Sequence, residues 1–183
     1  MKIIIYAPNL VSMDGVGNSS IYFMNLLKNF AEVELVANYS NIPGVLNFKE
    51  YLKKHKPNNI LFYHYSIVDP NIKLLLTLNF KKKIIYYHGI TPPKFFPYGS
   101  KLSNNCKKGL SDISILKDFD LYISNSSASK KQFLENLNQN YVDSKKFIIM
   151  PPINNFSNNK SYIKGRILES KIDFYYCGTI NNH

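Results

Sequence analysis

Apolar runs of strand length alternate with helix-like segments along the chain. Six such runs predict buried strands, at residues 2–7, 33–38, 59–66, 82–90, 120–126 and 146–152. Between them, helical spacing of apolar residues or helix-starting residues predicts helices at 18–30, 69–79, 106–119 and 127–139. Continuous apolar strands separated by helices are typical of a parallel sheet covered on both faces. We therefore expect an α/β fold with a Rossmann-like, doubly wound and mainly parallel sheet.

Residues that favour helix starts stand before three of these helices. Asn18 or Ser19 is expected to cap the first helix, and Asp69 the second. Ser126 or Ser127 is expected to cap the last one.

The pattern changes after residue 152. The stretch "NNFSNN" is polar and is interpreted as part of a linker over residues 153–171. The final "DFYYCGTINNH" combines a short apolar strand with a glycine turn, as at the start of a strand-turn-helix unit. We therefore expect one complete domain over residues 1–152, and over residues 172–183 the first strand of a second domain that the chain lacks.

Composition adds a strongly basic character. The formal net charge is +11, and Arg166 is the only arginine among the cationic residues. Such a charge suits phosphates, nucleic acid or an anionic membrane surface, although a lysine- and asparagine-biased composition explains it equally well. The scarcity of arginine argues against specific nucleic-acid recognition, which relies on bidentate arginine contacts.

The sequence also bears on the cellular location of the protein. It has no apolar run of membrane-spanning length, and the N-terminal "MKIIIYAPN" lacks a small-residue cleavage site. Cys106 and Cys177 stand far apart without metal-ligand spacing. These features predict a reduced cytoplasmic protein, with an additional peripheral contact to the anionic inner face of the membrane left open.

A glycine-rich segment follows the first predicted strand. Gly15, Val16 and Gly17 precede a helix, where backbone N–H groups and the helix dipole favour a phosphate. A segment shaped only for packing is the alternative. A dinucleotide fingerprint would need a third glycine, where the chain has Ser20, and an acidic residue after the second strand, where it has Asn38. A nicotinamide-dependent oxidoreductase is therefore disfavoured.

Polar side chains follow three other strands at the edge where parallel sheets bind ligands. His88 follows the fourth strand, and two histidines beside the glycine segment favour a site over two structural residues. The full set of candidate ligand-binding residues at these strand ends is His64, Tyr65, Ser66, His88, Asn125 and Ser126.

Two further stretches bear on the chemistry. The loop after His88 carries Phe95, Phe96 and Tyr98, which suit a sugar or lipid headgroup or else fold back over the core. Asp118 and Asp120 form an Asp-x-Asp pair at the amino end of a strand, away from the binding edge. We therefore expect no metal and no cofactor.

Several stretches together resemble the amino-terminal half of retaining glycosyltransferases of family four. They are the glycine segment before the first helix, "YHYS", "YHGITPPKFF", "CKKG" and "DLYISNSSASKKQF". These enzymes have the GT-B fold, in which two Rossmann-like domains face each other across a cleft. The resemblance covers about residues 1–152, and "FYYCGTINNH" is similar to the first strand of the carboxyl-terminal domain. Thr179 stands where the family has an arginine.

The resemblance implies a role for each matching residue. His88 would lie beside the reacting sugar and act in catalysis. Gly15, Val16 and Gly17 would face the phosphates of the nucleotide-sugar donor, and His64, Tyr65, Ser66, Asn125 and Ser126 would lie towards the acceptor.

The implied reaction moves a hexosyl group from a nucleotide-sugar to a glycan or lipid-linked acceptor during cell-surface polysaccharide synthesis. In this family the donor clamp belongs to the second domain, so the acceptor-side half is expected to turn over little or nothing by itself. A stand-alone binding module for anionic lipid or polysaccharide, without catalysis, is the alternative.

Overall fold

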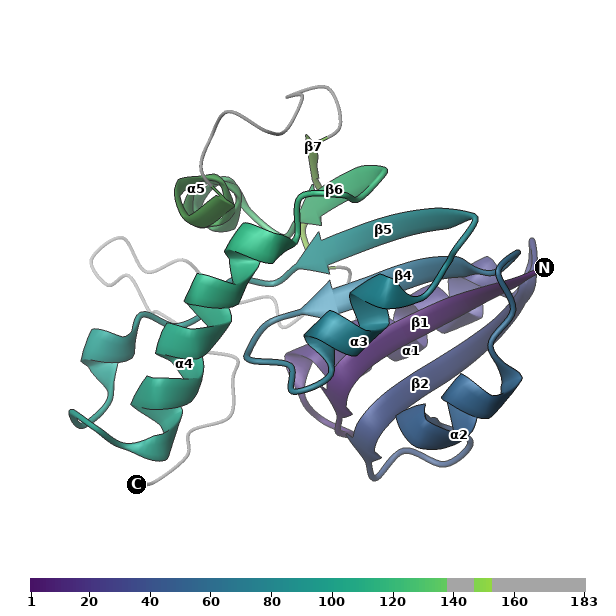
Figure 1. The fold of residues 1–183 in the computed structure, drawn as a ribbon, viewed down its shortest axis with the longest axis horizontal. Helices are drawn as coiled ribbons and strands as arrows, with labels where there is room; N and C mark the ends of the chain where they lie inside the picture. Colours follow the sequence, from purple (N-terminus) through teal and green to yellow (C-terminus); the bar gives the residue numbers. More distant parts are fainter. Residues whose placement is uncertain (138–146, 153–183) are drawn as a thin grey trace, which may run out of the picture.

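The strands of the computed structural model, which describes residues 1–137 and 147–152, form one parallel sheet. The order is β3-β2-β1-β4-β5-β6-β7, and Figure 1 shows it from β2 to β7. Because β2 and β3 extend from one side of β1 and β4 to β7 from the other, the strand order reverses between β1 and β4. Parallel sheets bind ligands at the carboxyl edge near such a reversal. The strands are β1 (Lys2–Leu10), β2 (Glu32–Ser40), β3 (Leu46–Asn47), β4 (Ile60–Tyr65), β5 (Lys82–Tyr87), β6 (Leu121–Ser124) and β7 (Phe147–Ile149).

Helices cover both faces, so the doubly wound α/β fold expected from the sequence is confirmed. Helix α1 (Gly15–Leu27) lies behind the sheet in Figure 1, where its Phe23 packs with Ile5 and Phe62. Side chains of four other helices join the cluster on the opposite face. These helices are α2 (Phe48–Lys54), α3 (Ile72–Thr77), α4 (Lys101–Asp112) and α5 (Ser127–Leu137), and two 3₁₀ turns, η1 (Pro93–Phe95) and η2 (Ile113–Ile115), flank α4.

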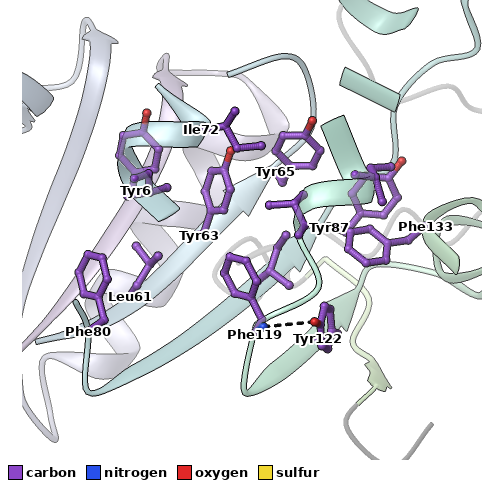
Figure 2. Close-up of a cluster of buried hydrophobic side chains, with 14 of the residues drawn as sticks. Tyr6, Leu61, Tyr63, Tyr65, Ile72, Phe80, Tyr87, Phe119, Tyr122 and Phe133 are labelled. Atoms are coloured by element: carbon purple, nitrogen blue, oxygen red, sulfur yellow. Dashed lines mark hydrogen bonds between the residues drawn. The ribbon is translucent and has the colours of Figure 1, made fainter. Parts of the chain in front are cut away.

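Tyrosines form much of the core on this second face, as Figure 2 shows. A buried tyrosine hydroxyl needs a partner, and each of these finds one. Tyr6 and Tyr63 donate to the two oxygens of Asp69, at 3.0 and 2.9 Å, and Tyr65 donates to the Gly109 carbonyl at 2.6 Å. Burial raises the pKa of all three tyrosines, which keeps the hydroxyls protonated as donors.

Asp69 is therefore a core residue, and the expectation that it caps a helix is wrong. Helix α3 begins later, at Ile72, and its capping position is Asn71. The Asp69 side chain points into the tyrosine cluster and also accepts the Asn71 backbone N–H at 2.9 Å. Burial raises the pKa of Asp69 although these hydrogen bonds oppose the shift.

Two other predicted helix starts are corrected. Helix α1 begins at Gly15, where Asp14 is the cap and its carboxylate accepts the Val16 N–H at 3.3 Å. Helix α4 begins at Lys101, because the Ser100 side chain caps it. The predicted cap of the last helix is confirmed as Ser126, whose hydroxyl accepts the Ser129 N–H at 3.1 Å.

The sequence reasoning missed β3 and α2 altogether. These elements have 2 and 7 residues, too few for a hydrophobic period to stand out. Asn47 caps α2 by accepting the Lys49 N–H at 2.9 Å, and Phe48 and Tyr51 anchor the helix in the core.

Only part of the domain organisation predicted from the sequence lies within the described residues. Strand β7 lies at the end of the predicted first domain, whereas the linker over 153–171 and the strand over 172–183 fall outside the described residues. Within residues 1–137 and 147–152, no helix has the length and apolar character required to cross a membrane.

Candidate functional site

Two histidines contact each other at the carboxyl edge of the sheet. His64, on β4, and His88, directly after β5, lie with His88 Nε2 2.9 Å from His64 Nδ1. Their rings are stacked with centroids 5.0 Å apart. His64 is fully buried, whereas His88 is half-buried and lines a surface hollow. The parallel pairing of β4 and β5 creates this contact from residues 24 positions apart.

Both imidazoles are neutral near pH 7. Burial lowers the pKa of His88 to about 4. The pKa of His64 lies well below its ordinary value, chiefly because of burial and also because of repulsion from His88. The His64 ring is surrounded by aromatic side chains, with ring centroids 5.0 to 5.9 Å away. Among the described residues, no acidic side chain pairs with either ring to stabilise a protonated form. His88 is thus suited to hydrogen bonding and is a weak base.

The surroundings of His64 also favour one placement of the proton between the rings. His64 Nδ1 faces both His88 Nε2 and the Ser20 hydroxyl, the latter at 3.4 Å, whereas His64 Nε2 is buried without a hydrogen-bond partner in the described structure. A buried N–H without an acceptor costs more than an unused lone pair. We therefore assign the proton to Nδ1 of His64, which donates to His88. The remaining proton of His88 then lies on its Nδ1, so this ring offers a neutral N–H donor beyond the pair.

The backbone of His88 is fixed from two sides. Its N–H donates to the Tyr65 carbonyl at 3.0 Å, and its carbonyl accepts the Asn125 side-chain amide at 2.8 Å. The following Gly89 has a φ of +86°, a conformation that favours glycine. From helix α5, Gln132 holds the next residue, Ile90, at both its N–H and its carbonyl, at 3.0 and 2.8 Å. The loop after His88 is therefore held in place by α5.

The hollow beside His88 has both polar and apolar lining and no charged side chain. It has a volume of about 320 Å³ and is open to solvent. The Ser124 hydroxyl and the Asn125 side-chain oxygen at this edge are buried and lack hydrogen-bond partners among the described residues. These two atoms are closed off from solvent, whereas the hydroxyl and amide groups that line the hollow are of the kind that recognises neutral polar ligands. The hollow is lined by His88, Gly89, Ile90, Thr91, Ala128, Ser129 and Gln132.

The glycine segment lies at the same edge, but it differs from the predicted loop. Gly15, Val16 and Gly17 form the first turn of α1. A β-carbon at Gly17 would overlap the Val11 carbonyl oxygen, whereas one at Gly15 would meet open space. Close packing therefore explains Gly17. Because Asp14 already accepts the Val16 N–H and carries negative charge, a phosphate would have to displace it, and the phosphate-binding role stays a prediction.

The remaining predicted residues occupy different settings. Tyr65 is fully buried, with its hydroxyl on Gly109, and presents no surface to a ligand (Figure 2). Ser66 is half-buried just after β4. Ser126 is the α5 cap. The side-chain amide of Asn125 donates to the backbone carbonyl of His88 and so helps to hold that residue in place. Thus the structure brings His64, His88 and Asn125 together, and gives Tyr65 and Ser126 structural tasks.

Sequence reasoning missed two residues of this site, Ser20 and Gln132. Ser20 is buried on α1 one turn before Phe23, so a serine on the apolar stripe of a helix was the available signal. Gln132 gave no signal, because only the fold brings α5 against the His88 loop.

A second, larger hollow lies at the same edge, beside α4. It has a volume of about 640 Å³ and receives residues from the ends of β1 and β2, the segment after β4, and α4. Most of its polar groups are side-chain amides, which bind hydroxyl groups through paired donors and acceptors. No sequence motif marked this hollow, because its walls come from four separate segments. The residues that line it are Pro8, Asn9, Asn38, Ile67, Val68, Pro70, Asn104, Asn105 and Lys108.

A metal centre has no ligand set in the described part of the chain. No three His, Cys, Asp or Glu side chains gather there. In the Asp-x-Asp pair, Asp118 is exposed, while Asp120 accepts the Lys82 ammonium at 2.9 Å and the Lys83 N–H at 2.8 Å.

Comparison with known proteins adds no relative: no protein-family model and no curated protein sequence matches the chain.

Proposed function

We propose that this chain is the acceptor-side lobe of a glycosyltransferase. The enzyme would move a hexosyl group from a nucleotide-sugar to a glycan or lipid-linked acceptor in polysaccharide synthesis at the cell surface. The proposal rests on the sequence motifs described above and on one structural observation. That observation is a neutral, half-buried His88, paired with His64, at the carboxyl edge of a parallel sheet.

The chemistry of the edge supports a sugar as the ligand. A sugar ring presents hydroxyl groups, which pair with neutral donors and acceptors such as an imidazole N–H, amides and hydroxyls. The hollow beside His88 supplies such groups from Thr91 and Ser129. The Gln132 amide is already bonded to Ile90. A free phosphate would instead favour cationic side chains, and none lines this hollow.

The second hollow offers room for the rest of an acceptor. Asn9 and Asn105 line it and make no side-chain hydrogen bond within the described structure, so their amides are available to a ligand. Both hollows open at the edge where β1, β4 and β5 end, which suits an extended glycan better than a single small molecule.

The division of work follows from the proposed architecture. His88 would hold the sugar by a hydrogen bond, because a pKa of about 4 makes its imidazole a poor general base at neutral pH. Stabilising the leaving nucleoside diphosphate requires cationic groups, which the resemblance places in a second lobe. The chain alone is therefore expected to bind acceptor and to catalyse little or no transfer, at the cytoplasmic side of the membrane.

Ligand screening by saturation-transfer NMR tests this proposal. The chain is mixed separately with neutral oligosaccharides, nucleotide-sugars and NAD. The proposal predicts saturation of sugar-ring protons in at least one oligosaccharide, loss of the signal in His88→Ala, and its retention in His55→Ala. His55 is a matched control, because its two ring nitrogens contact Tyr51 and the Asn79 carbonyl away from the site.

Three outcomes count against the proposal. No saturation transfer from any glycan would remove the acceptor role, and a response to NAD alone would favour an oxidoreductase. Glycan binding that persists in His88→Ala would favour the alternative, a binding module without catalysis, because such a module has no use for His88.

A further inference from the structure

The segment after the His88 loop forms a surface that the proposed reaction does not use. We call it the η1–α4 surface, and its exposed members are Lys94, Phe95, Tyr98, Lys101 and Lys107. The side chain of Phe95 is 68% exposed and that of Tyr98 is fully exposed. Phe30 and Tyr39 are exposed elsewhere in the chain, so what distinguishes this surface is the combination of its two rings with three lysines.

This surface carries unbalanced positive charge. The sequence has no acidic residue between Asp69 and Asp112. Lys108 pairs with Asp112, Nζ to Oδ1 at 2.6 Å, whereas Lys94, Lys101 and Lys107 have no ion pair in the described part of the chain. The nearest interaction of the Lys94 ammonium is with the face of Phe95, 5.4 Å from the ring centroid. An anionic partner would therefore meet uncompensated charge here.

Three members of this surface line a hollow. Its volume is about 550 Å³, and Lys94, Tyr98 and Lys107 all contribute to its wall. Lys94 comes from η1 and Lys107 from α4, and these elements are tied by the Ser103 hydroxyl, which donates to the Pro93 carbonyl at 3.2 Å. Two lysines that line one hollow together with Tyr98 fit a phosphate held at an apolar boundary.

We propose that the η1–α4 surface docks on an anionic phospholipid bilayer. Lipid phosphates lie between Lys94 and Lys107, and the rings of Phe95 and Tyr98 enter the interfacial layer. Lysine is well suited to this contact, because its apolar stem lies along the interface while its charge stays in water. Amphipathic aromatic rings have the same preference for the headgroup region. Each lysine near an anionic leaflet increases binding about fivefold.

Docking would also bring the sugar site close to the membrane. Only five residues separate His88 from Lys94 along the chain. A lipid-linked acceptor would then reach the hollow beside His88 from the bilayer. This consequence rests on the proposed function, whereas the docking itself does not.

Vesicle co-sedimentation of the full chain tests the proposal. Vesicles of phosphatidylcholine alone are compared with vesicles in which about one third of the lipid is phosphatidylglycerol. We expect binding only to the anionic vesicles. The double variant Lys94→Gln with Lys107→Gln should bind about 25-fold more weakly, from two losses of about fivefold. The variant Phe95→Ser with Tyr98→Ser should also bind more weakly, because it removes the rings that enter the interface.

Matched variants separate a specific surface from net charge. Lys28→Gln with Lys49→Gln removes two exposed lysines that lie after α1 and on α2, and should leave binding unchanged within about twofold. Phe30→Ser with Tyr39→Ser removes two exposed rings outside the surface and should also have no effect. All four positions tolerate these changes because their side chains are exposed.

Three results would overturn the proposal. Equal loss in the two lysine double variants would mean that net charge alone drives binding. Equal binding to neutral and anionic vesicles would exclude recognition of charge. Full competition by soluble glycerol phosphate or by single-stranded RNA at matched charge would assign the hollow to a soluble anion or to nucleic acid instead of a bilayer.

Discussion

His64 Nδ1 lies 2.9 Å from His88 Nε2, and this contact joins the buried interior of the sheet to its exposed edge. His64 is enclosed by aromatic rings and its Nδ1 also lies 3.4 Å from the Ser20 hydroxyl oxygen on α1, whereas His88 reaches the solvent. The orientation of the outer ring is therefore set by the inner one. Burial makes protonation of either ring unfavourable, and for His64 repulsion from a charged His88 adds to that effect.

Stability should fall in acid because of this pair. The pKa of His88 in the fold is about 4, below the value near 6.5 of the unfolded chain, so unfolding takes up a proton between these pH values. The stabilisation is complete above pH 6.5 and is lost as pH falls towards 4, by about 3 kcal/mol for His88 alone. His64 shifts in the same direction, while the raised pKa of Asp69 acts oppositely at the acid end.

Urea unfolding between about pH 7.5 and pH 4.5 measures this dependence. The double variant His64→Gln with His88→Gln should show a flatter profile than the native chain. A native profile that is already flat, or stability that increases on acidification, would contradict the neutral pair.

The two glycines at the start of α1 should respond oppositely to alanine. Gly17→Ala forces a β-carbon onto the Val11 carbonyl oxygen and should cost about 1–3 kcal/mol. Gly15→Ala meets open space and gains helix propensity, so stability should stay the same or increase by up to about 1 kcal/mol. Chemical denaturation of both variants checks the contrast, and equal effects would rule out the packing explanation for Gly17.

Removing a buried hydroxyl should destabilise the tyrosine core. Tyr63→Phe leaves one oxygen of the buried Asp69 without its donor, which should cost about 1.5–3 kcal/mol. Tyr39→Phe is the control, because that side chain is 62% exposed and should change stability by less than about 0.5 kcal/mol. Thermal unfolding distinguishes the two, and an unaffected Tyr63→Phe would show that the hydroxyl is dispensable.

Gln132 should control the rigidity of the loop after His88. In Gln132→Ala, the Ile90 N–H loses its acceptor and should exchange its hydrogen about 10 to 100 times faster. Asn136→Ala lies one turn later on α5 and has no bond to the loop, so Ile90 exchange should not change. Site-resolved hydrogen exchange provides the measurement; identical Ile90 rates in the two variants would mean that other contacts hold the loop.

The architecture was predictable because its signals are local. Continuous apolar strands and the helices between them appear in the sequence, and Ser126 was one of two serines expected to cap the last helix. The roles of Asp69 and Tyr65 could not, because they depend on tyrosines and a glycine carbonyl supplied by distant segments. An aspartate before a proline has the same local sequence whether it caps a helix or enters a core.

The candidate site was also only partly predictable. Placing His64 and His88 at one edge follows from parallel strands, but their hydrogen bond depends on the register of β4 with β5. The neutral state of both rings depends on the aromatic side chains around them, which the order of residues along the chain does not reveal.

The most direct measurement follows the imidazole nitrogens of His88 by NMR in a histidine-labelled chain. An oligosaccharide identified by saturation transfer is titrated near neutral pH, and His55 serves as the internal reference. The account predicts a His88 ring that is neutral before addition, carries its proton on Nδ1, and shifts on binding while His55 does not. A His88 ring that is protonated at neutral pH, or one that stays unchanged when the sugar binds, would contradict it.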